Sequence, residues 1–338
     1  MLAAYVMESP ATLETVAFGA GTKFVPRGLA RADARANLAC VCDSHAEVLA
    51  TRMLRRFLWH ELEKLGKRGG GSSVLALTSS GVVPCAGVCF HLYISTAPCG
   101  MASLPSDVQV CLPCRPGSLC KGTPAKHGKQ CWPPGCAGLA RPRGSHAAES
   151  LSCTDKVFRW ITCGFEGAML SGILDTPLRI ASLVLARKFK PGLAAAWLCP
   201  PDGDDAVPQL IHTDVRLEPA LLSAGYGQGD VGGMAGDGDE CASWCAALGD
   251  FADVHDGRTG LHPPGVRWSC APDASREATL AAARAALAEH DVALRFERVR
   301  QALDAEVRDA ASYRRMKEQA ASEGYCARKA RAAKWLNV

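Results

Sequence analysis

Two polar residues at the start of a predicted helix carry the first chemical signal in this sequence. His45 and Glu47 lie two positions apart in the segment CVCDSHAEVLATRML. A histidine at a helix start can direct its ring at a metal ion, and a carboxylate two residues later can reach an open coordination position. There the carboxylate can take a proton from a metal-bound water and pass it to a leaving group. An ordinary polar helix start explains the same pair, so the chain must supply further ligands.

A proline–cysteine pair supplies the next part of a metal site. Zinc nucleobase deaminases carry H-x-E followed by P-C-x-x-C, in which the histidine and both cysteines bind zinc and the glutamate moves protons. Here Pro98-Cys99 follows a predicted strand, but Ala102 stands where the second cysteine would be. The third ligand must therefore come from elsewhere. Cys153 is the best candidate because it precedes a predicted helix at 155–172, and helix N-termini favour thiolates.

Other cysteines offer competing interpretations. Pro84-Cys85 is a second proline–cysteine pair, but Cys89 follows it one residue too late for the motif. Cys111-Leu-Pro-Cys114 is a true C-x-x-C, which can hold a structural zinc ion or consist of ordinary loop thiols. Three later cysteines could complete such a structural site: Cys120, Cys131 and Cys136.

The composition limits the class of protein. The chain has 338 residues, of which 48% are hydrophobic, and a net charge of +4. A strongly basic nucleic-acid-binding arm is excluded, whereas a local basic patch is not. The first 25 residues lack the pattern of a signal peptide, and no apolar run reaches the roughly 18 residues of a membrane span. The absence of a signal peptide predicts a nuclear or cytoplasmic chain that is not secreted. In such a chain an odd number of cysteines, 17, favours thiols and metal ligands over a disulfide framework.

Predicted strands alternate with predicted helices, which indicates an α/β sheet with helices packed on it. Two segments lack this periodicity. Residues 101–150 are rich in Pro, Gly and Cys and predict an irregular loop, and residues 199–265 are rich in Gly and Asp and predict a flexible insertion. Residues 275–336 are predicted to be mostly helical. The other predicted elements are a strand and turn at 14–25, a helix at 45–66, a strand at 87–96, the helix at 155–172 and a strand at 178–187.

Four blocks together resemble a known family, the adenosine deaminases acting on RNA and their tRNA-specific relatives. The resemblance covers about half of the chain. It implies a single editase domain over residues 1–338, with a cytidine-deaminase-like mixed sheet flanked by helices and extended by a mostly helical C-terminal part. The four blocks, in chain order, are GAGTK (19–23), DSHAEVLATR (43–52), YISTAPCG (93–100) and SCTDKVFRWITCGFEGAMLS (152–171).

The resemblance also implies roles for individual residues. It implies zinc binding by His45, Cys99 and Cys153. Glu47 would transfer protons in a hydrolytic deamination of adenosine to inosine. Thr22 and Lys23 fall where family members line the substrate entrance, and a solvated turn lysine is the alternative for Lys23.

The resembling family buries inositol hexakisphosphate beneath its zinc site. Lys156 and Arg159 share a face of one predicted helix, and buried cations require acidic side chains or a bound polyanion. Cys42 and Thr51 depart from the family's usual Asn and Arg. A solvated basic helix is the alternative explanation for the C-terminal lysines. The resemblance implies these polyphosphate ligands: Arg52, Lys156, Arg159, Trp160, Tyr313, Lys317, Tyr325, Lys329 and the loop residue Lys126.

The expected substrate is tRNA. The segment before His45 is too short for a separate double-stranded-RNA-binding domain, which favours the tRNA-specific branch. That branch deaminates the adenosine 3′ of the anticodon of an alanine tRNA, and loop bases are splayed into a pocket at lower cost than paired ones. The alternatives are a deaminase of double-stranded or messenger RNA, an inactive RNA-binding relative, a protein with a structural zinc ion in the 111–136 loop, and a cytidine or free-nucleoside deaminase. The missing local second cysteine disfavours the last of these.

Overall fold

The chain folds around a mixed sheet of seven strands, in the order β11-β10-β2-β1-β7-β8-β9. β8 runs parallel to both of its neighbours, and the other pairs are antiparallel. This computed structural model describes residues 1–24, 41–66, 71–78, 81–103, 151–199, 207–214, 240–249, 253–257, 259–260, 301 and 310–336. The strands are β1 (Leu2–Glu8), β2 (Leu13–Ala20), β7 (Cys89–Ile94), β8 (Ile180–Leu185), β9 (Gln209–His212), β10 (Glu240–Cys245) and β11 (Asp253–Asp256).

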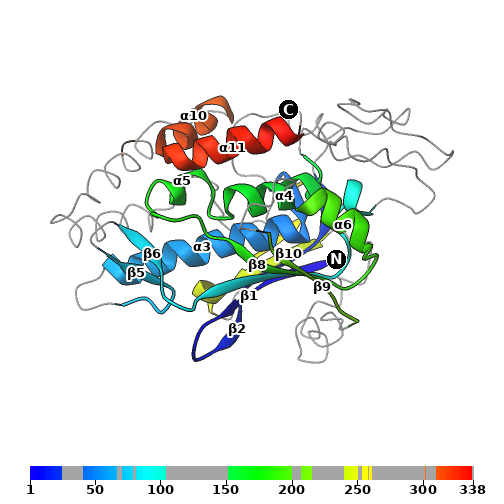
Figure 1. Cartoon of the computed structure of the whole chain (residues 1–338), viewed down its shortest axis with the longest axis horizontal. Coiled ribbons are helices and arrows are strands. Elements are labelled where there is room, and N and C mark those ends of the chain that lie inside the picture. The colour runs from blue at the N-terminus through cyan, green and yellow to red at the C-terminus, as the bar shows by residue number, and fades with distance from the viewer. Residues whose placement is uncertain are drawn as a thin grey trace.

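Two small sheets and several helices complete the described structure. The described helices of the domain lie on one side of the large sheet, with α10 and α11 outermost over α4 and α5 (Figure 1). The small sheets pair β3 (Thr22–Phe24) with β4 (Asp43–His45), and β5 (Leu75–Leu77) with β6 (Val82–Pro84). The α-helices are α3 (Ala46–Gly66), α4 (Cys153–Cys163), α5 (Gly167–Ser171), α6 (Pro191–Leu198), α10 (Ala310–Ala320) and α11 (Glu323–Leu336), and the 3₁₀ helices are η1 (Met101–Ser103) and η2 (Ala246–Leu248).

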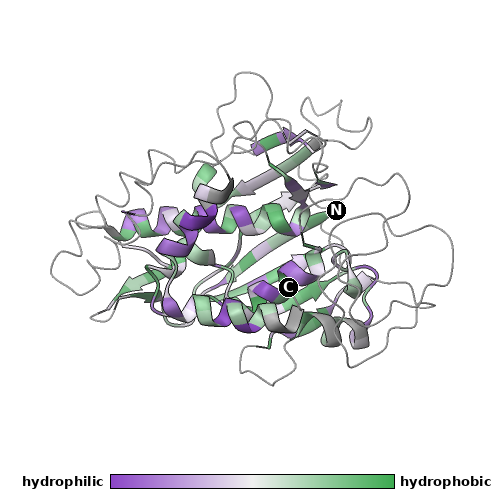
Figure 2. Ribbon diagram, turned by 90° about the horizontal axis from the view of Figure 1, so that it is seen from above, coloured by the Kyte–Doolittle hydropathy of each residue, from purple (hydrophilic) through white to green (hydrophobic). Residues whose placement is uncertain are grey.

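The core lies between the sheet and its helices. The helices show hydrophilic and hydrophobic residues in alternation along their length, as expected when one face packs inward (Figure 2). Phe165 occupies the centre of this core, with its ring 5.5 Å from that of Tyr5 and 5.3 Å from that of Phe90. Fully burying one such side chain contributes about 1.5–3 kcal/mol. The large side chains buried with it include Met7, Leu54, Leu58, Leu92 and Ile94.

A glycine allows α3 to lie close against β2. A Cβ atom added at Gly19 would meet the carbonyl oxygen of Ala46 at 2.5 Å and the side chain of Leu49 at 2.5 Å. Any other residue would therefore push the start of α3 away from the sheet. The first glycine of the GAGTK block thus fixes where the following helix begins, and with it the position of the H-x-E residues.

The α/β architecture and the main elements are confirmed, but one predicted helix is divided. The helix expected at 155–172 is two helices, α4 and α5. Helix α4 starts two residues before the predicted helix, because Ser152 caps it by accepting a hydrogen bond from the amide of Asp155. It stops at Gly164, whose backbone has a φ of 94°, a conformation that favours glycine and breaks the helix.

The prediction of a flexible insertion at 199–265 is wrong for three strands. β9, β10 and β11 come from this range and form both edges of the large sheet. Short apolar segments such as QLIH and ECASWC did not stand out against the Gly- and Asp-rich sequence around them. The irregular loop predicted at 101–150 begins with η1, and its residues 104–150 lie outside the described residues. Of the helical part predicted at 275–336, residue 301 and residues 310–336 are described. No helix in the described ranges has the length and apolar character of a membrane span.

Candidate active site

His45 is the last residue of β4, and three contacts fix its backbone. It lies directly opposite Thr22 of β3 in the register of the small sheet. Its own amide donates to Oδ1 of Asp43 at 3.2 Å. The amide of Ala46 donates to the carbonyl of Gly21 at 3.1 Å. The imidazole is 9% exposed, so it is presented from a fixed strand end in a nearly buried position.

Cys153 is the first residue of α4, and its position follows from the serine that caps this helix. The hydroxyl of Ser152 accepts from the amide of Asp155 at 3.2 Å and donates to Oδ2 of the same residue at 2.8 Å. The first of these bonds satisfies one of the amide groups that a helix start otherwise leaves unpaired, and the second fixes the direction of the capping hydroxyl. Cys153 is fully buried immediately after the cap. The S-C-T-D sequence therefore encodes both the helix start and the thiol at that start.

Thr154 holds the Pro98–Ala102 segment against the start of α4. Its amide donates to the carbonyl of Cys99 at 2.9 Å, and its hydroxyl donates to the same carbonyl at 3.0 Å. The hydroxyl also accepts from the amide of Ala102 at 3.2 Å. These bonds join two segments that are about 50 residues apart in sequence, and they place Cys99 beside Cys153.

The three predicted ligands converge. Nδ1 of His45 lies 3.2 Å from Sγ of Cys153 and 3.6 Å from Sγ of Cys99. All three ligand atoms lie within 4.8 Å of one another. A tetrahedral zinc ion places such nitrogen and sulfur ligands about 3.5–3.8 Å apart. The group could therefore hold zinc with three protein ligands and one open position. Among the His, Cys, Asp and Glu side chains of the described residues, these three form the group that could hold a metal ion.

Glu47 and β3 lie beside this cluster. Glu47 is in the first turn of α3, two residues after His45, and its side chain is fully buried. Thr22 is exposed and Lys23 is half-buried on β3, the strand paired with the ligand strand. Phe24, which the sequence did not single out, has its ring 6.4 Å from the ring of His45. In the sequence, Phe24 directly follows the GAGTK block, and that position is the signal that could have found it.

Lys156 has a partner from its own chain. Its ammonium group pairs with Oδ2 of Asp43, the residue that also receives the amide of His45. The pair joins α4, which carries Cys153, to β4, which carries His45. The sequence analysis expected either an acidic side chain or a bound polyanion beside the buried charge of Lys156. The structure shows an acidic side chain, that of Asp43. The pair also ties the two ligand-bearing elements to each other.

The other expected polyphosphate ligands are distributed over four helices. α11 packs on α4, where Tyr325 contacts a cluster of Phe158, Cys163 and Ala332. Burial raises the pKa of the Tyr325 phenol, and the nearby guanidinium groups of Arg55 and Arg159 oppose that shift. The structure thus brings Arg159 and Tyr325 near each other, and Arg55, which the sequence analysis did not name, also lies near this tyrosine.

For the remaining expected polyphosphate ligands, the structure gives the helix or the burial of each side chain. Trp160 is 9% exposed. Three basic residues are half-buried on separate helices: Arg52 on α3, Lys317 on α10 and Lys329 on α11. Tyr313 belongs to α10. Lys126 lies outside the described residues.

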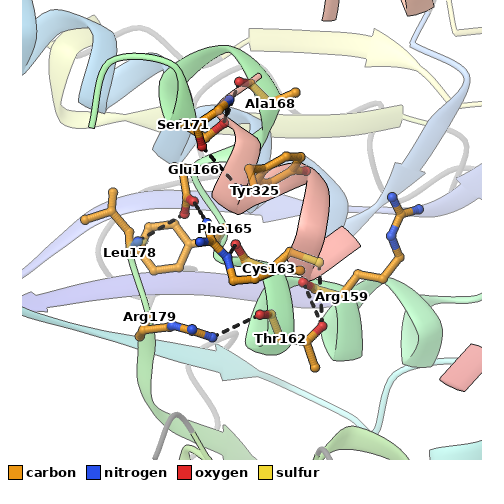
Figure 3. A network of polar contacts seen from close by, with 12 residues as sticks. Arg159, Thr162, Cys163, Phe165, Glu166, Ala168, Ser171, Leu178, Arg179 and Tyr325 are labelled. Atoms are coloured by element: carbon orange, nitrogen blue, oxygen red, sulfur yellow. Dashed lines mark hydrogen bonds and ion pairs between the residues drawn. The ribbon is translucent and has the colours of Figure 1, made fainter. Parts of the chain in front are cut away.

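A buried carboxylate between α4 and α5 contacts the C-terminal helix α11. Glu166 accepts from the amide of Leu178 at 3.0 Å and from Nη2 of Arg328 at 3.4 Å. Arg328 also donates through Nε to the carbonyl of Cys163 at 3.0 Å. Glu166, Cys163 and Tyr325 gather at the end of α4 (Figure 3). The sequence analysis missed this network, although a lone acid in the apolar block GFEGAML is a signal for it.

The Glu166 network predicts a pH-dependent stability. Burial raises the pKa of the Glu166 carboxyl from 4.5 to about 7. Folded protein therefore holds this proton to a higher pH than the unfolded chain, and stability falls as pH rises through the interval from about 5 to about 7. Glu166→Gln removes this titration and keeps an acceptor for the amide of Leu178. Between pH 5 and pH 8, the free energy of unfolding of the wild type should fall by about 2–3 kcal/mol more than that of the variant.

Urea unfolding at several pH values measures this difference. The wild-type and Glu166→Gln curves of unfolding free energy against pH should converge at low pH and separate as pH rises, with the variant relatively more stable at pH 8. Parallel curves over this interval would contradict the assignment of a raised pKa to Glu166.

Comparisons with known proteins agree with the geometry. A family model described as the adenosine-deaminase (editase) domain matches residues 17–199, which is more than half of the chain. The double-stranded RNA-specific editase Adar of Drosophila melanogaster is 31% identical over 168 residues, which cover 46% of this chain and 25% of that protein. The double-stranded RNA-specific adenosine deaminase of Rattus norvegicus is 27% identical over 254 residues, which cover 68% of this chain and 21% of that protein.

A third relative belongs to another branch. The tRNA-specific adenosine deaminase 1 of Drosophila melanogaster is 28% identical over 187 residues, which cover 50% of this chain and 43% of that protein. The chain thus spans less than half the length of each of these relatives. The matched range contains the converging ligands His45, Cys99 and Cys153 and the buried Glu47. On these grounds, this chain belongs to the family of adenosine-deaminase (editase) domains.

Proposed function

We propose that this chain is a zinc-dependent deaminase that converts adenosine to inosine in RNA. The observation that carries the proposal is the convergence of one imidazole nitrogen and two thiol sulfurs beside a buried glutamate. This donor set matches the one that nucleobase deaminases use for zinc, with the glutamate as a proton carrier rather than a ligand. Family membership supports the same chemistry.

The roles of the residues follow from their positions. His45, Cys99 and Cys153 would hold zinc, which when bound activates a water molecule for attack on C6 of the base. Glu47 receives the proton released by that water and delivers it to the amino group, which leaves as ammonia. The Glu47 side chain is fully buried, which limits its contact with bulk water. Phe24 and Thr22 lie on β3 beside His45 and would contact the extruded base.

The proposed substrate is tRNA, at the adenosine 3′ of the anticodon of an alanine tRNA. A tRNA-specific relative among the matches supports this choice. The base of a loop nucleotide can enter the site without the cost of breaking a base pair. A net charge of +4 suits a compact RNA bound by local basic patches. Duplex RNA is the second candidate, because the editase Adar of Drosophila melanogaster is 31% identical.

Inosine mapping separates the two substrates. Zinc-loaded protein is incubated with an unmodified alanine tRNA transcript, with the same transcript carrying guanosine 3′ of the anticodon, and with a long RNA duplex. Sequencing should find inosine beside the anticodon of the first RNA and none in the second. Inosine in the duplex alone would keep the proposed chemistry and contradict the tRNA assignment.

We also propose that inositol hexakisphosphate is buried against α4 and α11. Arg159 and Arg55 lie near Tyr325, and burial in this region makes an anionic partner favourable for their charges. Purified protein should release about one hexakisphosphate per chain on denaturation, detectable by mass spectrometry. Arg159→Met should lose the compound, whereas Arg56→Met on α3, whose charge lies near Cys245 instead, should keep it. Folded wild-type protein without the compound would contradict this proposal.

A further inference from the structure

The ligand strand β4 depends on side-chain contacts for its position. β4 has three residues and pairs with β3, the one strand that the described residues place beside it. Side chains alternate along a strand, so Asp43 and His45 share one face and Ser44 lies on the other. Asp43 is tied to Lys156 of α4 on the first face. What contacts Ser44 on the second face therefore decides whether β4 is held from both sides.

The contact on that second face comes from β11. Nε2 of His255 lies 2.8 Å from the hydroxyl oxygen of Ser44. Both side chains are buried, with 1% of His255 and none of Ser44 exposed. A buried hydrogen bond of this kind is costly to leave unmade, because neither group can turn to water instead. The bond spans 211 positions in the sequence, from the first third of the chain to a strand that composition alone does not predict.

The turn that follows β11 adds a backbone contact. The carbonyl of Gly260 accepts from the amide of Val41 at 2.8 Å, two residues before β4 begins. Two hydrogen bonds close that turn. The amide of Gly260 donates to the carbonyl of Asp256 at 2.7 Å, and the amide of Thr259 donates to Oδ1 of Asp256 at 2.8 Å. The approach to the ligand strand is therefore held by β11 at a second point.

The partner strand β10 contacts both strands of the small sheet. Cys241 lies opposite His255 in the β10–β11 register. Burial raises the pKa of its thiol, and the amides of Thr22 and Lys23 and the Ser44 hydroxyl, which lie close to the sulfur, oppose that shift. Cys241 is also buried in a cluster with Val41 and Leu49, which places it behind both β4 and α3. The 240–256 hairpin therefore supports the strand that carries the metal ligand and the strand that borders the substrate.

We propose that this hairpin is a positioning element of the deaminase site and that His255 is its main positioning residue, which orients His45 by holding Ser44. The inference rests on the proposed zinc-dependent function of the same site. Partners that orient metal ligands from outside the coordination sphere typically contribute 10- to 100-fold to metal affinity. His255 acts through one intervening residue, so we expect an effect of about tenfold, at the lower end of that range.

The chain offers a matched control for the test. His91 of β7 also bonds a serine of the neighbouring strand, with Nδ1 2.8 Å from the hydroxyl of Ser182. His91 also pairs with Glu8 at 3.0 Å. His91→Leu therefore removes a histidine–serine bond from the same sheet without touching the small sheet of β3 and β4. Any loss shared by the two variants reflects general stability, and a loss confined to position 255 reflects the metal site.

Zinc affinity, measured by competition with a chromophoric chelator, tests the proposal. His255→Leu should weaken zinc binding about tenfold, and His255→Gln, which can place an amide nitrogen near Nε2, should recover most of it. The His91→Leu variant should bind zinc as the wild type does. The turnover number on RNA should fall more than KM rises in His255→Leu, because the reacting groups are displaced while the RNA-binding surface is kept.

Two results would overturn the inference. One is equal zinc affinity in His255→Leu and His91→Leu, and the other is no recovery in His255→Gln. If His255→Leu does not fold, Ser44→Ala removes the same bond by a smaller change and should weaken zinc binding to a similar extent. Wild-type protein that binds no zinc and forms no inosine would instead contradict the proposed function, so the two failures are distinguishable.

Discussion

Glu47→Gln should lower the rate of adenosine deamination by about 10²- to 10⁴-fold. The amide has nearly the same shape as the carboxylate, but it cannot accept the proton of the attacking water or deliver one to the leaving amine. The side chain is fully buried, so no outside base can take over its role. Zinc content and unfolding temperature should stay close to those of the wild type, because Glu47 is not one of the three converging ligands. Single-turnover kinetics on the RNA substrate measure the effect.

A second glutamate of α3 provides the control for this prediction. Glu61 is 2% exposed and pairs with Lys64 and Ser72. Glu61→Gln changes a buried carboxylate on the same helix at a distance from the metal ligands, and it should leave the chemical step intact. A Glu47→Gln rate within tenfold of the wild-type rate would show that another group moves the proton.

Cys153→Ala should remove zinc and activity together. Two protein ligands cannot hold the ion in a site built for three, and metal-free protein has no means of activating water. Metal analysis after dialysis should find about one zinc per chain in the wild type and close to none in the variant. Cys163→Ala is the matched control, because Cys163 is a buried cysteine at the other end of α4 and lies outside the metal cluster.

The same measurement decides between the two zinc interpretations of the sequence. A structural site in the 111–136 loop predicts that zinc survives Cys153→Ala and is lost on replacing Cys111 and Cys114. Retention of zinc by Cys153→Ala, with activity retained as well, would contradict the three-ligand site described here.

The three converging residues, His45, Cys99 and Cys153, could be predicted from sequence because each belongs to a short local pattern. H-x-E marks a helix start, P-C follows a strand, and S-C-T-D places a capping serine before a thiol at the first helical position. These patterns do not state that the three segments meet. The structure supplies that step through Thr154, which binds the Cys99 segment to α4, and through Lys156, which ties α4 to Asp43.

The supporting groups could not be predicted, because they are defined only by tertiary contacts. His255 lies in a range whose composition indicated an insertion, and nothing near it in sequence links it to Ser44. Glu166 and Arg328 are 162 positions apart, and their pairing depends on how α11 packs on α4. Short strands such as β10 and β11 carry too few residues for a reliable alternation signal.

Helix α4 links the cluster of His45, Cys99 and Cys153 to the C-terminal helix α11. α4 provides Cys153 at its start and the contact with α11 at its end, while β4 is held by α4 on one face and by the β10–β11 hairpin on the other. Changes in the C-terminal part can therefore reach the catalytic residues through a single helix.

The most direct test of the central claim is the amount of inosine formed by zinc-loaded protein. A mixture of tRNA and long duplex RNA is incubated with the wild type or with Glu47→Gln, digested to nucleosides, and quantified by mass spectrometry. We expect inosine to accumulate with the wild type, with an equal loss of adenosine, and to stay at background with the variant. Absence of inosine with folded, zinc-loaded wild-type protein would contradict the deaminase assignment and favour an RNA-binding relative without catalytic activity.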